Sequence, residues 1–236
     1  MSQTSPERPA RRGGSPTGGQ RANVRGQVTR QRILTAAERL FAEHGISAVP
    51  LRDIGIAAGQ RNHASVQYHF GDRDEVVKAI MEFRGAESEA SRTGIVADLM
   101  LGGRTPTVTD VVSAFVRPLA IHFQPDNHYL PFLSLYITEE GGYEGLVGVR
   151  TGSSVVTLRT LLGRLVPQVP EAVLDERWLV TLTSAVHALA RYQSAQRKRA
   201  HLPAKIDVLV EDLITFLSAG ILAPLAQGDP RAALTD

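Results

Sequence analysis

Residues 51–76 read LRDIGIAAGQRNHASVQYHFGDRDEV, and this stretch decides the fold of the chain. It predicts a short helix that ends at an Ala-Gly pair, a tight turn, a second helix over residues 62–70, and the start of a third helix. Gly59 provides the left-handed backbone geometry that the turn requires. In the second helix, Val66 and Phe70 recur at helical spacing and are expected to face inward. The arrangement is typical of a helix-turn-helix, whose second helix enters the DNA major groove.

The same stretch resembles the TetR family of bacterial transcription regulators, and the resemblance covers residues 29–80. That family has a helix that ends in an aromatic residue and a Gly, followed by Val/Leu-Arg-Asp-Ile and an Ala-Gly turn. Its recognition helix then closes on His-Phe, and a small polar residue, a Lys or Arg, and an acidic residue follow. Each segment alone is weak, but their order, spacing and helical phase agree. The matching segments are residues 39–45 (RLFAEHG), 51–54 (LRDI), 58–59 (AG), 69–70 (HF) and 72–74 (DRD).

Three positions depart from that family's pattern. The turn at residues 60–62 is one residue longer than usual, and Gln67 stands where the family has Tyr. Val49 and Pro50 replace the Thr or Ser that caps the second helix. Pro is tolerated at a first helical position, because its missing N–H would have no partner there. The departures leave the predicted fold unchanged and affect the base-by-base contacts.

The outer face of the predicted recognition helix supplies the candidate DNA contacts. Gln67 is expected to hydrogen-bond adenine N6 and N7, and Ser65 to reach a base or a phosphate. Tyr68 and His69 are expected to contact phosphate or sugar, since most protein–DNA bonds go to the backbone. By the resemblance, Arg73 takes the family's Lys position and binds phosphate. The remaining candidates are Thr29, Arg52, Arg61, Asn62 and His63. The alternative for each is a solvated surface residue.

Length and composition exclude several classes of protein. Of the 236 residues, 43% are hydrophobic, which suffices for a sizeable core. The absence of Cys excludes disulfides, thiolate metal sites and cysteine nucleophiles. No apolar run approaches the ~20 residues of a membrane span, and the amino terminus lacks the apolar region of a secretory signal. We therefore expect a cytoplasmic protein.

The charge is unevenly distributed along the chain. Residues 1–32 contain seven Arg and one acid, Glu7, so their net charge is +6, and the whole-chain value of +2 leaves −4 for the remainder. Residues 1–26 are rich in Gly, Pro, Ser and Arg and are predicted to be a disordered basic arm. Such an arm either touches phosphates or reaches into a minor groove, or it is a solvated tail; both interpretations stay open.

The remaining periodicity is helical throughout, which predicts an all-α fold. The predicted organisation is an amino-terminal three-helix helix-turn-helix domain (residues 27–75), a larger helical domain for effector binding and dimerisation (residues 76–225), and a flexible tail (residues 226–236). Thr29 is a candidate N-cap for the first helix and Gly45 its stop. A capping pair of Asp72 and Glu75 opens the fourth helix. The predicted helices span residues 29–44, 51–58, 62–70, 72–91, 108–123, 130–138, 146–166, 174–198 and 206–222, with a loose region at 94–106 and a break at Pro118.

The last two predicted helices carry broad apolar stripes. Either they simply close the core, or they pair with their twins in a four-helix dimer interface. The resemblance favours a homodimer, which would place two recognition helices in successive major grooves of a near-palindromic operator, roughly 34–36 Å apart.

The resemblance also implies a pocket for a small-molecule effector between the middle helices. Its broadly apolar candidate lining favours an apolar or aromatic effector over a sugar phosphate. The alternative for each residue is the ordinary core, because aromatics at helical spacing usually pack there. The candidates are Phe83, Phe115, His122, Phe132, Tyr136, Trp178, Thr181 and His187.

The sequence thus predicts a ligand-responsive DNA-binding regulator, most simply a repressor, with no cofactor and no enzymatic activity. Two other classes compete with this prediction. A metal-dependent or other enzyme on an all-α scaffold would use His122, Asp126 and His128 around one turn, although no Walker loop, GxSxG elbow, HExxH or dinucleotide motif is present. A pure interaction module would tolerate substitution of Gln67 and Tyr68.

Overall fold

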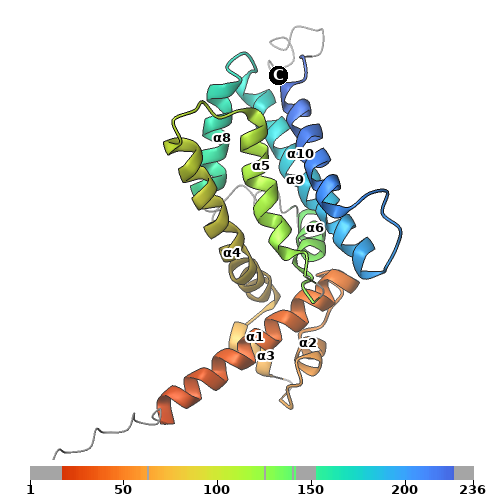
Figure 1. The fold of residues 1–236 in the computed structure, drawn as a ribbon. Helices are drawn as coiled ribbons and strands as arrows, with labels where there is room; N and C mark the ends of the chain where they lie inside the picture. The colour runs from red at the N-terminus through yellow and green to blue at the C-terminus, as the bar shows by residue number, and fades with distance from the viewer. Residues whose placement is uncertain (1–17, 63, 125, 140, 142–152, 226–236) are drawn as a thin grey trace, which may run out of the picture.

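The protein is all-α over the residues that the computed structural model describes, which are 18–62, 64–124, 126–139, 141 and 153–225. Helices α1 to α3 form one end of the molecule, and α4 leads from them into an elongated helical body (Figure 1). The helices at the first end are α1 (Gly18–His44), α2 (Leu51–Ala57) and α3 (Ser65–Phe70). The body consists of α4 (Arg73–Leu101), α5 (Val108–Leu119), the 3-10 turn η1 (Ala120–His122), α6 (Tyr129–Glu139), α8 (Ser153–Leu165), α9 (Glu171–Arg197) and α10 (Ile206–Leu222).

Helix α5 is the centre of the body. It packs against α4, α8, α9 and α10, and its residues Val111, Val112, Ala114 and Val116 have no exposed surface. Full burial of each Val side chain stabilises the fold by roughly 1.5–3 kcal/mol. Helix α6 lies between α9 and α1, so it joins the body to the helix-turn-helix end.

Local caps determine where several helices begin and end. The Asp72 carboxylate accepts the backbone N–H of Glu75 at 2.9 Å at the start of α4, as the sequence predicted. Thr107 and Asp110 form a complete capping box at the start of α5. Gly45 follows α1 with φ of +92°, a conformation that a residue with a side chain rarely adopts. The predicted stop of the first helix is therefore confirmed.

Two predicted boundaries of the first and fourth helices are wrong. Helix α1 begins at Gly18, so Thr29 lies inside the helix, and residues 18–26 of the predicted disordered arm are helical. The apolar periodicity used for the prediction starts only at Ile33, and the polar residues before it gave no pattern to detect. Helix α4 continues through the predicted loose region to Leu101, because Val96 is buried and extends its apolar face.

The other boundaries differ less. Helix α10 has the predicted bounds, whereas α9 begins at Glu171, behind Pro170. Pro118 lies within the last turn of α5, which passes into the 3-10 turn η1 directly after it. The predicted helix over 146–166 is α8, and its first residues fall outside the described part, as do His63, the tail 226–236 and residues 1–17. None of the described helices is both long and apolar enough to cross a membrane.

Candidate nucleic-acid interface

Helix α3 has one buried and one exposed face. Val66 is fully buried and Phe70 nearly so, and together they attach α3 to the core of the three-helix unit. Gln67 and Tyr68 lie on the opposite side and are exposed. The Tyr68 side chain is 85% exposed, which is costly for an aromatic ring unless a partner covers it. The exposed face of α3 therefore presents a hydrogen-bonding amide and a phenol side by side.

Ser65 does not lie on that exposed face, which corrects the sequence-based expectation. It is 9% exposed, and its hydroxyl has no hydrogen-bond partner among the described residues. Gly55 of α2 is buried, and a Cβ at that position would lie 3.7 Å from the Ser65 Oγ. The first residue of α3 thus faces α2 at Gly55.

The turn before α3 holds two further candidates. Arg61 and Asn62 are both exposed. The Asn62 side-chain oxygen accepts the backbone N–H of Ala64 at 2.9 Å, so it stabilises the start of the recognition helix. The neighbouring candidate, His63, lies outside the described residues.

Arg73 also differs from its expected role. Its Nη2 donates to the backbone carbonyl of Val49 at 3.1 Å, and its Nε is buried without a partner in the described chain. The side chain is half-buried and ties the start of α4 to the segment before α2. The position of Arg73 therefore suits a structural role, in which its side chain fixes the two helices relative to each other. It suits phosphate binding less well.

Arg30 is a residue of this surface that the sequence reading missed. Its Nη1 donates to the carbonyl of His69 at 3.1 Å, and its guanidinium carbon lies 4.3 Å from the centre of the Phe70 ring. Thr29 beside it is half-buried, whereas Arg52 on α2 is exposed, with its Nε 3.4 Å from the Asp53 carboxylate. Arg30 joins α1 to the carboxyl end of α3; only its place in the basic run marked it in the sequence.

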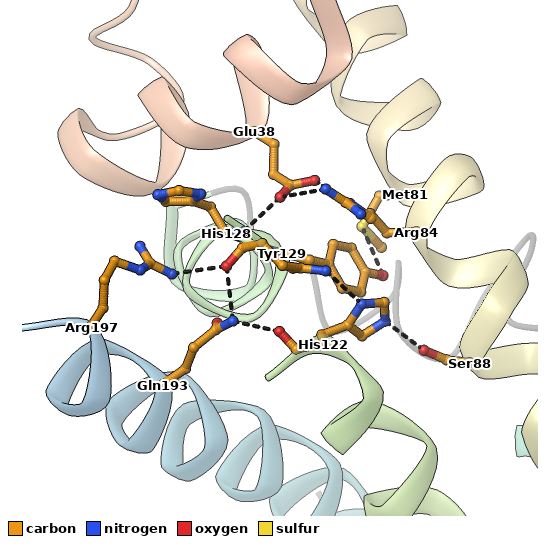
Figure 2. Close-up of polar contacts among 10 residues, drawn as sticks. Glu38, Met81, Arg84, Ser88, His122, His128, Tyr129, Gln193 and Arg197 are labelled. Carbon is orange, nitrogen blue, oxygen red and sulfur yellow. Dashed lines mark hydrogen bonds and ion pairs between the residues drawn. The ribbon is translucent and has the colours of Figure 1, made fainter. Parts of the chain in front are cut away.

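A buried polar cluster connects this end of the molecule to the body (Figure 2). Glu38 of α1 is 1% exposed. Its carboxylate accepts Nε and Nη2 of Arg84 on α4, at 2.6 and 3.2 Å, and the backbone N–H of His128 at 2.7 Å. One carboxylate therefore joins α1, α4 and the segment before α6. Glu38 lies within the apolar stripe of α1, between Leu34 and Phe41 at helical spacing, and an acid in such a stripe is the sequence signal of a buried charge.

His122 occupies the other side of the same cluster. Its Nε2 lies 2.8 Å from the Ser88 Oγ on α4, and its Nδ1 lies 3.1 Å from the Asn127 side-chain nitrogen. Gln193 of α9 donates to the carbonyls of both His122 and Asn127, at 2.5 and 2.8 Å. Arg197 adds a bond to the Asn127 carbonyl at 2.9 Å. His122 is thus held by α4 and α9 together, and Asn127 by α9 (Figure 2).

Burial sets the protonation state of this cluster. Burial, and to a smaller extent the positive charge of Arg84, lower the pKa of His122 from 6.5 to about 4. Burial and the charge of Arg197 also lower the pKa of His128. Burial raises the pKa of the Tyr129 phenol. Both imidazoles are therefore neutral at pH 7.

The predicted effector-lining residues fall into separate places. Phe115 and Trp178 are both buried and meet edge to face, with ring centres 6.0 Å apart. Phe132 and Tyr136 stack within α6, 6.4 Å apart, and His187 of α9 lies 2.6 Å from the Ser134 hydroxyl. The other three candidates belong to neither of these groups. His122 belongs to the polar cluster, Thr181 bonds to the carbonyl of Arg177 on its own helix, and Phe83 is 39% exposed on α4.

A buried charge beside Phe115 escaped the sequence reading. Arg92 of α4 is 5% exposed, and its guanidinium carbon lies 5.3 Å from the centre of the Phe115 ring. Its Nη1 bonds to Glu89 at 2.9 Å, while its Nε is buried without a partner in the described residues. Glu89 in turn accepts the Ser154 hydroxyl of α8 at 2.7 Å. Burial lowers the pKa of Arg92.

The metal-site alternative finds no geometric support. Among the described residues, no group of three or more His, Cys, Asp or Glu side chains is arranged to hold a metal ion. Both ring nitrogens of His122 are occupied by Ser88 and Asn127. The exposed Asp126 and the buried His128 belong to the same segment but form no such group. In the described part of the chain, the metal-dependent alternative therefore has no group of three such ligands.

Two family models cover the two parts of the chain. The one described as bacterial regulatory proteins, tetR family, matches residues 33–80, which contain most of the helix-turn-helix unit. The one described as tetracyclin repressor-like, C-terminal domain, matches residues 113–220 of the body. The chain belongs to the TetR family of bacterial transcription regulators, as its sequence had indicated.

Individual relatives and solved structures are similar over different shares of the chain. The HTH-type transcriptional repressor Rv3405c of Mycobacterium tuberculosis is 44% identical over 55 residues, which are 23% of this chain and 29% of that protein. The match thus spans less than a third of the curated relative. AmtR of Mycobacterium smegmatis aligns with a TM-score of 0.48 at 18% identity, over 80% of this chain and 86% of that chain. The TetR-family regulator SCO0857 of Streptomyces coelicolor A3 aligns with a TM-score of 0.43 at 19% identity, over 89% and 100%.

Proposed function

We propose that this protein is a ligand-responsive transcriptional regulator that binds a near-palindromic DNA operator as a homodimer and represses the adjoining genes. The observation that carries the proposal is the exposed face of α3, with Gln67 and Tyr68 on a helix held rigidly by Val66 and Phe70. A helix presented in this way, within a helix-turn-helix of the TetR family, suits the major groove.

In this proposal Gln67 reads a base edge, while Tyr68, His69, Arg52, Arg61 and Thr29 contact the backbone. Phosphate contacts position the protein and base contacts specify the sequence. Asn62 and Arg73 contribute by fixing the start of α3 and of α4, since their side chains bond to Ala64 and Val49. Ser65 supports the packing of α2 on α3 and does not contact a DNA base.

The dimer is proposed to form through α9 and α10. These helices pack against each other, and they leave large apolar side chains exposed to solvent. Such a surface suits a second copy of the chain, because pairing two helices from each protomer buries it in a four-helix interface. The exposed apolar residues are Val180 on α9 and Val208, Phe216 and Leu222 on α10.

The effector is proposed to bind beside Phe115 and Trp178. These rings favour an apolar or aromatic molecule, and the unpartnered Nε–H of Arg92 would donate to one hydrogen-bond acceptor on it. Trp178 is the one tryptophan of the chain, so its fluorescence reports directly on binding there. A bound molecule would displace α4, and the Arg84–Glu38 pair would transmit that displacement to α1.

The experiment that tests the function is selection of fragments from sheared genomic DNA by purified protein at physiological salt, followed by sequencing. The proposal predicts one enriched near-palindrome, lost when Gln67 and Tyr68 are both replaced by Ala. Salt-sensitive retention of all fragments without any enriched sequence would contradict it, because phosphate contacts alone give such binding.

A further inference from the structure

The connector between α1 and α2, residues 46–50, is held from two sides by side chains that are distant in the sequence. The Glu139 carboxylate on α6 accepts the backbone N–H of Ile46 at 2.9 Å and, more weakly, that of Ser47 at 3.5 Å. At the other end of the connector, Arg73 of α4 donates to a backbone carbonyl at 3.1 Å. The start of α2 is therefore connected to both α6 and α4.

Gly45 makes the contact with Glu139 possible. Its φ of +92° lies in the left-handed region, and a left-handed residue after a helix turns the following N–H groups to one side, where they can bind an anion. A Cβ at Gly45 would lie 2.9 Å from Oε1 of Glu139. Any side chain there would push the carboxylate away. The position therefore requires glycine for the approach of Glu139 as well as for its own backbone conformation.

The helix ends around Glu139 disfavour a negative charge. Glu139 is the last residue of α6, and Gly45 directly follows the last residue of α1. The carboxyl end of a helix carries partial negative charge, so both ends repel a carboxylate beside them. The N–H groups of the connector offset that repulsion, because hydrogen bonds to a charged acceptor are stronger than bonds between neutral groups. The contact thus gives a physical reason for an acid at this position.

Helix α6 anchors Glu139 in the body. It packs against α9 on one side and α1 on the other (Figure 1), and Phe132 and Ile137 on it are buried. The Ser134 hydroxyl lies 2.6 Å from Nδ1 of His187 on α9. A shift of α6 relative to α1 would therefore move the carboxylate, and with it the connector that leads into α2.

We propose that Glu139 is a positioning residue for operator binding: its carboxylate fixes the connector to α6 and so sets the orientation of α2 and α3 on the DNA. This inference rests on the proposed function and adds a regulatory contact to it. The contact is separate from the Arg84–Glu38 pair, because it passes through α6 and not through α4. Breaking it lowers operator affinity without removing any group that touches DNA.

The test measures binding to the operator found by selection and to a random-sequence duplex of equal length. For Glu139→Ala we expect operator binding to be on the order of tenfold weaker, a typical size for coupling between distant sites. Binding to the random duplex should stay at the wild-type value, and so should the slope of log K against log salt, because no phosphate contact is lost. Urea unfolding establishes that the variant is fully folded under the binding conditions.

Three further variants complete the design. Glu87→Ala removes the same charge from an exposed position of α4 and should bind both duplexes like the wild type. Glu139→Gln keeps an acceptor oxygen without the charge, so its loss should be only about threefold, since charge-assisted bonds are roughly twice as strong as neutral ones. Gly45→Ala displaces the carboxylate, so combining it with Glu139→Ala should cost less than the product of the two single losses.

Wild-type operator affinity in Glu139→Ala would overturn the inference, and so would single losses that simply multiply in the double variant. Equal losses on the operator and the random duplex would also contradict it, because a positioning residue acts on the specific complex.

Failure of the proposed function gives a different result, because the wild type would then select no operator. Hydrogen exchange of the free protein tests the contact in that case, followed by mass spectrometry of a peptide that contains Ile46 and Ser47. Their amides should exchange faster in Glu139→Ala than in the wild type, since they lose their acceptor. Equal exchange in the two proteins would reject the contact.

Discussion

At the scale of single residues, Gln67 and Tyr68 are neighbours on α3, and we expect them to have different roles in DNA binding. The amide of Gln67 can donate to and accept from one adenine edge, and such a pair is worth about 1–3 kcal/mol of discrimination. Gln67→Ala should therefore relax specificity at one position in each half-site. Tyr68→Ala should instead weaken binding to all sequences. Competition binding across single-base operator variants separates the two, and equal losses on operator and random duplex for Gln67→Ala would refute its role.

His122 makes stability dependent on pH. Its folded-state pKa of about 4 lies below the ordinary value of 6.5, so the unfolded chain binds the extra proton between these values. The contribution of neutral His122 to the free energy of unfolding is fully present above pH 6.5. It is lost as the pH falls toward 4, by up to about 1.4 kcal/mol per pH unit. Urea unfolding should show about 2 kcal/mol less stability at pH 5 than at pH 7.

The matched variant is His122→Gln, which does not titrate. Its pH dependence should be shallower by one proton, and a remaining slope is expected from His128, whose pKa burial also lowers. Identical pH profiles for the variant and the wild type would show that His122 is not the titrating group.

Residue-level prediction from sequence succeeded where exposure follows from helical phase alone. Val66 and Phe70 are buried and Gln67 and Tyr68 exposed, as their spacing indicated. Ser65 was misplaced because the predicted start of the helix was three residues too early, and the approach of α2 at Gly55 has no local sequence pattern. The carbonyl of Val49 that Arg73 contacts and the Phe115 ring beside Arg92 come from distant segments, which periodicity cannot show.

At the scale of helices, the contact of α1 with α4 and α6 depends on a buried ion pair. Replacing Glu38 by Gln leaves the Arg84 guanidinium, whose side chain is 18% exposed, without its counter-charge. Breaking such a pair costs about 3–5 kcal/mol. Glu43→Gln is the control, because its exposed pair with Arg39 contributes less than about 1 kcal/mol. Urea unfolding measures both, and equal stability losses would contradict the special position of Glu38.

Helix identity was predictable where an amphipathic pattern spans many turns, as in α9 and α10. Helix ends were less so, because the start of α1 lies in a polar, Gly-containing stretch and α4 passes through Gly94 without a break. The candidate DNA contacts that could be predicted from the sequence lie on short segments that are local in the chain. The polar cluster around Glu38 and His122 joins residues of α1, α4 and α9 to the residues between η1 and α6, and only the tertiary fold brings them together.

At the scale of the whole molecule, the proposed dimer places the two recognition helices. Phe216 is 71% exposed on α10, and Phe216→Glu should shift the protein to monomer and reduce operator affinity by at least tenfold. Val156→Glu introduces the same charge at an apolar residue that is 54% exposed on α8, and it should remain dimeric. Sedimentation velocity distinguishes these states. A dimer that survives Phe216→Glu would place the interface elsewhere.

The most direct measurement of the central claim is a hydroxyl-radical footprint of the wild-type protein on its selected operator. The account predicts two equivalent protected regions on one face of the duplex, with centres roughly 34–36 Å apart, as two α3 helices in successive major grooves require. Both regions should disappear together in Phe216→Glu. A single protected region, or two that persist in a protein shown to be monomeric, would contradict a dimeric regulator that reads DNA through α3.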